Sequence, residues 1–159
     1  MYTQDTFDCP CLSEQQKELI DQGFHLLDHV RQHGETFKDF SFVVFPFAKA
    51  YEGYLKELFL KTGLITKEDY FSKHFRIGKV MSPSLTERLR TSSVYKKICE
   101  RSGCDLSEAI WFTWRKSRNE VFHYFPDNYK EITLKEAEER IQMILETVKK
   151  SCEELSSKS

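Results

Sequence analysis

The sequence is poor in the two residues that most often interrupt helices. It contains 6 glycines and 4 prolines in 159 residues, and its apolar residues recur every three or four positions rather than every two. This spacing argues against a β-rich fold and predicts an all-α protein, a helical bundle of about four main helices plus short helices. The length suits one domain over residues 1–159, with an N-terminal arm over 1–12 and a polar tail over 153–159 that frays.

Long apolar runs, a secretory signal and an excess of either charge are also absent. The longest apolar stretch, Phe42–Ala48, is far shorter than the roughly 20 residues that span a bilayer. The start of the chain has no basic region followed by an apolar core, so we expect a cytoplasmic protein with no membrane partner. Lysine and arginine total 24 against 25 acidic residues, so RNA is expected to bind only at a local basic patch.

The cysteines do not form a recognisable framework. Their number, five, is odd, and nothing suggests export, so we expect reduced thiols. Cys9 and Cys11 are separated by one proline, and Cys99 and Cys104 do not form a Cys-x-x-Cys pair. A structural zinc site is therefore not expected, and Cys99 and Cys152 are interpreted as small core residues.

Histidines offer no better metal site. His25, His29 and His33 share one face of the first predicted helix at a spacing that can place two imidazoles on a metal. No carboxylate lines up to complete the ligand set. The sequence therefore predicts neither a metal nor a cofactor.

Helix beginnings are marked by capping boxes, in which Ser, Thr or Asp is followed three residues later by Gln or Glu. The four boxes are Ser13 with Gln16, Ser84 with Glu87, Asp105 with Glu108, and Thr133 with Glu136. Together with glycine and proline stops, the pattern predicts long helices from 13, over 41–61, from 106 and from 134, and short helices from 66, 84 and 94. Residues 74–83 are expected to form a basic loop. The apolar stripe of the last helix suits either bundle packing or a dimer seam.

One helix end carries most of the chemistry. Arg115, Lys116, Arg118, Asn119 and His123 lie within nine residues. In a regular helix Asn119 and His123 share a face, whereas Arg118 lies about 140° from His123 and flanks them. A guanidinium holds phosphate oxygens, an imidazole moves protons near neutral pH, and an amide orients either group. The set predicts phosphodiester chemistry without a metal, and the alternative is an ordinary solvated helix end.

The segment Arg118-Asn119-x-x-x-His123, near the end of a penultimate long helix, resembles the Arg-x(4–6)-His signature of the HEPN superfamily. The run from Phe45 to Lys56, followed by Gly63-Leu64-Ile65, is similar to the HEPN toxin domain of the RNase LS family. The similarity covers about residues 40–148. Members of that family carry further domains before the HEPN unit, so this chain resembles a stand-alone HEPN protein or an excised domain.

The resemblance implies a HEPN-like bundle that dimerises across an Arg/His cleft, and a metal-independent endoribonuclease that leaves 2′,3′-cyclic phosphate and 5′-hydroxyl ends. His123 would act as general acid or base, Arg118 would stabilise charge on the phosphate, and Asn119 would orient one of them. Substrate contacts are assigned to Lys49, Arg115, Lys116 and Tyr124.

Glu52 matches an acidic residue of the RNase LS helix. The resemblance implies that Glu52 orients His123 or Arg118 across the bundle. The other interpretation, which stays equally open, is an ordinary surface pair with Lys56, four residues along the same helix.

The resemblance also implies a partner. HEPN toxins controlled by a nucleotidyltransferase antitoxin carry His-x-Tyr, whereas this chain has Phe125, with Tyr124 out of register. The expected partner is therefore a cognate antitoxin protein that occludes the cleft, although Tyr124 or Tyr129 stays open as a modified residue.

The functional expectation is the toxin of a toxin–antitoxin or phage-defence pair. The alternative is a non-catalytic HEPN-like helical module that binds RNA or a partner protein, and a third interpretation is a plain bundle assembled through its last helix.

Overall fold

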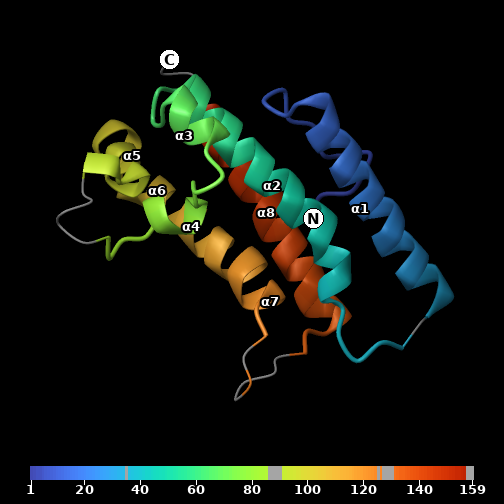
Figure 1. The fold of residues 1–159 in the computed structure, drawn as a ribbon. Coiled ribbons are helices and arrows are strands. Elements are labelled where there is room, and N and C mark those ends of the chain that lie inside the picture. Colours follow the sequence, from blue (N-terminus) through green and yellow to red (C-terminus); the bar gives the residue numbers. More distant parts are fainter. Residues whose placement is uncertain (35, 86–90, 125, 127–130, 157–159) are drawn as a thin grey trace.

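The computed structural model describes residues 1–34, 36–85, 91–124, 126 and 131–156 (Figure 1), and all regular structure in this part of the chain is helical. The prediction of an all-α protein is confirmed. The elements are α1 (Glu14–His33), α2 (Ser41–Lys61), α3 (Lys67–Phe71), α4 (Ile77–Val80), α5 (Val94–Ser102), α6 (Cys104–Trp114), the π-helical turn η2 (Arg115–Asn119), α7 (Glu120–Phe122) and α8 (Leu134–Ser156). None of these helices is long and apolar enough to cross a membrane.

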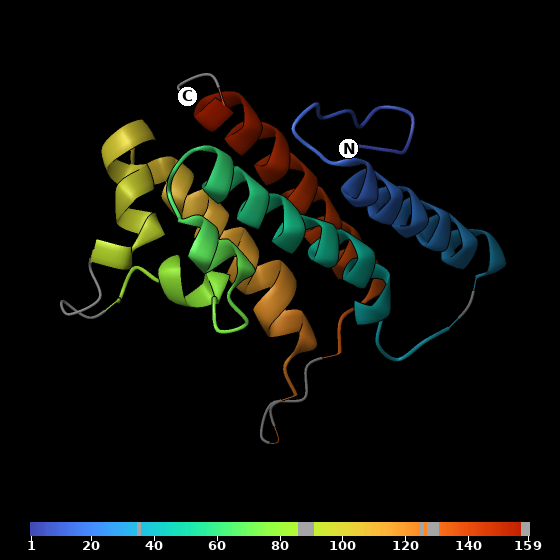
Figure 2. The same cartoon turned by 45° about the horizontal axis from the view of Figure 1, so that its top comes forward.

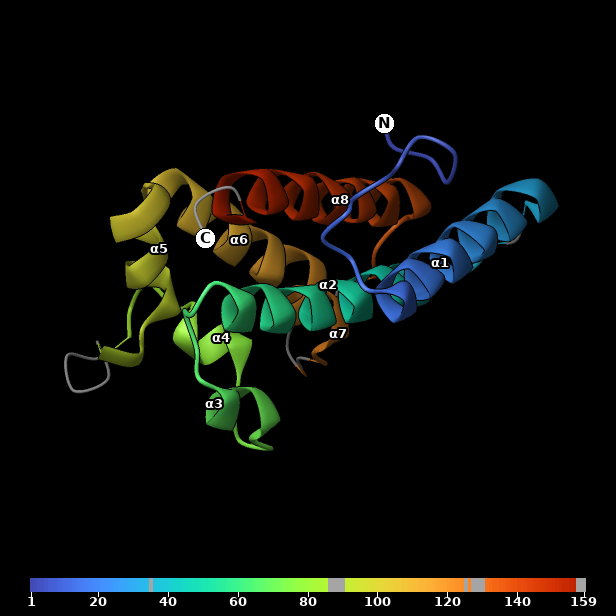
Figure 3. The same cartoon turned by 90° about the horizontal axis from the view of Figure 1, so that it is seen from above.

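Helix α2 is the centre of the bundle. It packs against α1 and against α8, while α6 also packs on α8 and is covered at its start by α5 (Figures 1 and 2). Seen from above, α2 and α8 run alongside each other (Figure 3), and Figure 1 shows α1 beside α2. This position follows from the sequence of α2, which is apolar nearly all round at its start and therefore needs partners on several sides.

Two buried tyrosines connect α2 to its neighbours. The hydroxyl of Tyr51 donates a hydrogen bond to the carbonyl of Ile110 in α6 (3.2 Å). The hydroxyl of Tyr54 bonds the carbonyl of Val148 (3.1 Å) and the Ser151 hydroxyl (2.9 Å), both in α8. Burial raises the pKa of both phenols well above the ordinary value of tyrosine, so both side chains are neutral in the folded protein.

Two of the four predicted capping boxes begin helices in the structure. The Ser13 amide donates to the Gln16 side chain (3.0 Å), and the Thr133 amide donates to Glu136 (2.8 Å). The box expected at 105–108 is wrong, because α6 begins at Cys104 directly after Gly103. Gly103 has a φ of 94°, a conformation that only glycine adopts easily, and it both ends α5 and begins α6. The helix expected from 84 falls largely on residues outside the described part.

The expected loop over 74–83 contains the short helix α4. Ile77 and Met81, four residues apart, are 2% and 0% exposed, and their burial brings this segment onto the core. The fraying expected from 153 is also wrong as far as the structure describes the chain. Helix α8 continues to Ser156 because Leu155, at 0% exposure, extends its apolar stripe. That stripe is buried within the chain, as bundle packing requires, and so is not available as a dimer seam.

The N-terminal arm folds back onto α8 (Figure 3). The amide of Tyr2 donates to the Gln142 side chain (2.6 Å), and the carbonyl of Tyr2 accepts from the same side chain (2.9 Å). Cys9 and Leu12 are buried. The arm is thus part of the fold rather than an extended tail.

The expectation of reduced thiols is contradicted. Cys11 and Cys152 are paired as a disulfide with their Cα atoms 6.0 Å apart, and Cys99 is paired with Cys104 at 4.1 Å. The first pair joins segments 141 residues apart in sequence. The number of cysteines does not reveal the pairing of Cys11 with Cys152. These two side chains meet because the arm folds onto α8.

Gly23 lies where α1 meets α2, and we expect Gly23→Ala to lower the free energy of unfolding by about 1–3 kcal/mol. An alanine Cβ there would overlap the ring of Phe47, which is fully buried. Urea unfolding monitored by circular dichroism measures the difference.

Gly53→Ala is the matched control, because its Cβ would be 3.4 Å from the end of the Gln16 side chain. This substitution is expected to stabilise by up to about 1 kcal/mol, since alanine favours the helix more than glycine does. Equal effects of the two substitutions would contradict the close packing at Gly23.

Candidate active site

The helix that carries the candidate motif is not regular. A π-helical turn, Arg115–Asn119, follows α6, and α7 ends at Phe122, so that His123 is extended (φ −92°, ψ 127°). Inside η2, Ser117 is buried and its hydroxyl donates to the carbonyl of Arg140 in α8 (3.3 Å). The angle of about 140° expected between Arg118 and His123 assumed a regular helix, and it does not apply to this turn.

Arg118 and His123 border the same pocket, whose volume is about 400 Å³. The pocket lies between the N-terminal half of α2 and the segment formed by η2 and α7. Its lining residues are Phe45, Ala48, Lys49 and Glu52 from α2, with Arg118, Phe122 and His123 from the other side. Four of the eight residues selected from the sequence therefore meet at one place: two from α2 and two from the motif.

Three neighbours orient the guanidinium of Arg118. It lies over the ring of Trp114, 5.2 Å from the ring centre. One nitrogen is 3.7 Å from a carboxylate oxygen of Glu52, and another is 3.4 Å from the side-chain oxygen of Asn119. About a third of the side chain remains exposed, so the guanidinium is directed but still accessible to an anion in the pocket.

Glu52 makes both of the contacts that the sequence left as alternatives. Its carboxylate pairs with Lys56 (3.3 Å) on its own helix and with Arg118 (3.7 Å) across the pocket. The Glu52 carboxylate therefore contacts the Arg118 guanidinium and the Lys56 ammonium group at the same time.

The remaining selected residues have other surroundings. Arg115 and Lys116 pair with Glu120, at 3.6 Å and 2.8 Å, and Arg115 borders a separate pocket beside Trp111 and other side chains of α6. Tyr124 is 73% exposed and is not a lining residue of the first pocket. Asn119 is not a lining residue of the pocket, but its side chain contacts Arg118, which is.

The rim of the pocket is aromatic, which the sequence analysis did not anticipate. Phe45 and Phe122 are 53% and 36% exposed and meet edge to face with ring centres 5.6 Å apart. The apolar run at the start of α2 was a signal for an exposed ring. Such a run covers more of the helix surface than one buried face, so some of its side chains remain exposed.

A second missed residue is Gly78 in α4. A Cβ at this position would be 3.0 Å from the indole nitrogen of Trp114, a nitrogen that is buried without a hydrogen-bond partner in the structure. The absence of a side chain at Gly78 lets α4 approach the indole on which the Arg118 guanidinium rests.

The pocket combines an anion-binding guanidinium, a lysine, an imidazole and a carboxylate. Such a set binds a phosphate and transfers protons near neutral pH. Among the described residues, the group of His, Cys, Asp or Glu side chains close enough to hold a metal ion lies elsewhere, at the N-terminal arm. No protein-family model, curated protein or solved structure matches this chain.

Proposed function

We propose that this protein is a metal-independent endoribonuclease of the HEPN type. The observation that supports the proposal is the placement of Arg118 and His123 on one pocket, with the guanidinium directed by Trp114 and Glu52. A side chain that binds phosphate and one that transfers protons both take part in the cleavage of RNA by its own 2′-hydroxyl.

In the proposed reaction the imidazole of His123 accepts the proton of the ribose 2′-hydroxyl. The 2′-oxygen forms a bond to phosphorus while the bond from phosphorus to the 5′-oxygen breaks, and that leaving oxygen takes up a proton. The products are a 2′,3′-cyclic phosphate and a 5′-hydroxyl. Arg118 stabilises the negative charge that grows on the phosphate oxygens in the transition state.

The other pocket residues support these two groups. Glu52 and Asn119 fix the position of the Arg118 guanidinium, which lowers the entropy lost when phosphate binds. Lys49 adds a positive charge from α2 at the edge of the pocket. We assign Lys49 to a phosphate of the RNA backbone, and we place Arg115, Lys116 and Tyr124 along the RNA outside the pocket.

The reaction needs a proton acceptor and a proton donor, and the pocket of one chain holds one histidine. In the proposed homodimer the partner's His123 supplies the second group. The exposed rings of Phe45 and Phe122 beside the pocket are the apolar surface that the partner would cover.

Such an enzyme suits a toxin of a toxin–antitoxin or phage-defence pair acting in the cytoplasm, controlled by an antitoxin protein that covers the pocket. The second candidate is a non-catalytic module that binds RNA or a partner protein through the same cations and aromatic rim. Both candidates use the pocket, and they differ only in whether a phosphodiester bond breaks.

One preparation tests the enzyme and the dimer. Purified protein incubated with total RNA in excess EDTA is expected to cleave it and to leave 2′,3′-cyclic phosphate and 5′-hydroxyl ends. Light scattering is expected to give about twice the 18.9 kDa mass of the chain. Cleavage that EDTA abolishes contradicts the mechanism, a monomeric mass contradicts the dimer, and RNA binding without cleavage supports the second candidate.

A further inference from the structure

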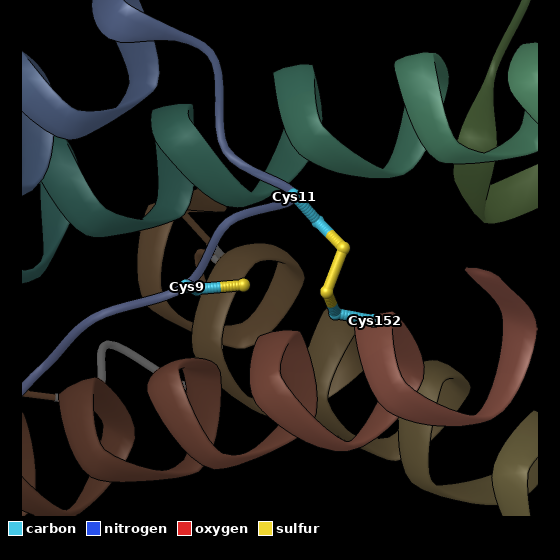
Figure 4. A group of neighbouring side chains, drawn as sticks. All are labelled: Cys9, Cys11 and Cys152. Carbon is cyan, nitrogen blue, oxygen red and sulfur yellow. A yellow bond between two sulfur atoms is a disulfide. The ribbon is translucent and has the colours of Figure 1, made fainter. Parts of the chain in front are cut away.

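Three cysteine side chains meet where the N-terminal arm lies on α8 (Figure 4). Cys9 and Cys11 come from the arm and Cys152 from α8, and their three sulfur atoms all lie within 4.8 Å of one another. Cys9 and Cys152 are 2% and 7% exposed, while Cys11 is half-buried. The cluster does not include any residue of the pocket that contains Arg118.

A disulfide between Cys11 and Cys152 accounts for two of the three sulfurs. It gives no role to Cys9, whose sulfur is directed toward the same point as the others (Figure 4) and belongs to neither disulfide. A thiol of this kind serves as a small core residue or as a third ligand. Two cysteines with one residue between them, facing a third from another element, favour the second role.

The spacing suits a metal that prefers sulfur. Zinc binds thiolate sulfur at about 2.3 Å, and in tetrahedral geometry this places two ligand sulfurs about 3.8 Å apart. Sulfurs within 4.8 Å of one another therefore reach such an ion with small side-chain movements. In the described part of the chain no carboxylate or imidazole joins the group, which disfavours calcium and magnesium because both prefer oxygen.

Groups of both charges surround the cysteine cluster. Three thiolates and one Zn²⁺ carry a net charge of -1. Burial raises the pKa of the Cys9 thiol, and the nearby carboxylates of Asp8 and Glu153 act in the same direction, whereas a backbone hydrogen bond from Cys11 and the charge of Lys149 lower it. A bound Zn²⁺ ion would supply the positive charge that offsets this burial and keeps the three thiolates ionised.

We propose that the reduced protein binds one Zn²⁺ ion through Cys9, Cys11 and Cys152, with a water molecule as the fourth ligand on the half-exposed side of Cys11. Reduction comes first: a phosphine and water convert the disulfide to two thiols and become the phosphine oxide. Binding then releases one proton from each of the three thiols and forms three zinc–sulfur bonds. The ion would join the arm to the last turns of α8, the same two segments that the disulfide joins.

The test uses the full chain, reduced with a water-soluble phosphine and freed of metal by chelation. Titration with Co²⁺, a spectroscopic substitute for zinc, is expected to produce thiolate-to-metal absorption that saturates at one ion per chain and disappears when Zn²⁺ is added. Zinc is also expected to raise the melting temperature of the reduced protein.

Matched variants identify the ligands. Cys9→Ser and Cys11→Ser are each expected to lower Zn²⁺ affinity by at least about tenfold, while Cys99→Ser with Cys104→Ser leaves it unchanged. Circular dichroism confirms that each variant is helical, and because Cys11 is half-buried its variant remains informative if Cys9→Ser fails to fold. Absence of the absorption in the fully reduced wild type overturns the proposal. So does unchanged affinity in both single variants, or a disulfide that the phosphine cannot reduce in the folded chain.

Discussion

Replacing His123 with alanine is expected to lower the rate of RNA cleavage by roughly 10²–10⁴-fold. The reason is that His123 lines the pocket together with the Arg118 guanidinium, and an imidazole is the side chain suited to transfer protons near neutral pH. Product formation from a labelled oligoribonucleotide, measured at equal protein concentration in EDTA, gives the rate.

His25→Ala is the matched control. His25 is exposed on α1, away from the pocket, and its replacement is expected to leave the rate within about twofold of the wild type. Both variants should keep the helical content and mass of the wild type, since neither histidine is buried. Equal cleavage by the His123→Ala variant would remove His123 from the reaction and with it the proposed mechanism.

A large loss of stability is expected above pH 10. Tyr51 and Tyr54 are buried, and burial raises the pKa of both phenols in the folded state well above the value of about 10 that they have when unfolded. Their contribution to stability is complete below pH 10. As the pH rises beyond that point the unfolded chain loses their protons and the folded chain keeps them, so the free energy of unfolding falls by about 2.7 kcal/mol per pH unit.

Urea unfolding at pH 9, 10 and 11 measures this slope, and Tyr54→Phe isolates one phenol. The variant is expected to lose about 1 kcal/mol at neutral pH, because it removes the hydrogen bonds to Val148 and Ser151. It is also expected to show about half of the alkaline slope attributed to the two tyrosines. All other titratable groups are the same in the two proteins and therefore cancel in the comparison. An identical slope in the variant would contradict a buried, neutral Tyr54.

Local signals in the sequence were sufficient for the long helices. The bounds of α2 followed from its apolar run and the glycine after it, and the starts of α1 and α8 followed from Ser13 with Gln16 and Thr133 with Glu136. Each of these features acts within one or two turns, so a single sequence contains it. The same reasoning failed at Gly103, where one glycine ends a helix and begins the next and makes a capping box unnecessary.

The geometry of the site could not be predicted from residues that are close together in the sequence. The π-helical turn depends on where Ser117 meets α8, and a sequence motif does not distinguish it from an ordinary helical turn. The contact between Glu52 and Arg118 joins residues 66 positions apart, and only the resemblance to a known family suggested it. Cys9 and Cys11 approach Cys152 because the arm folds back along α8, which no spacing in the sequence encodes.

The hydrogen bond from Ser117 to Arg140 also makes the geometry of the pocket depend on a helix that is synthesised late. Helix α8 leaves the ribosome after every other described helix, yet it holds the π-helical turn through Arg140 and accepts the hydrogen bond of Tyr54 through Val148. A nascent chain that ends before α8 has neither contact, and its apolar α2 has lost one of its two main partners. The contacts by which α8 holds the π-helical turn beside the pocket therefore form only after synthesis has reached that helix.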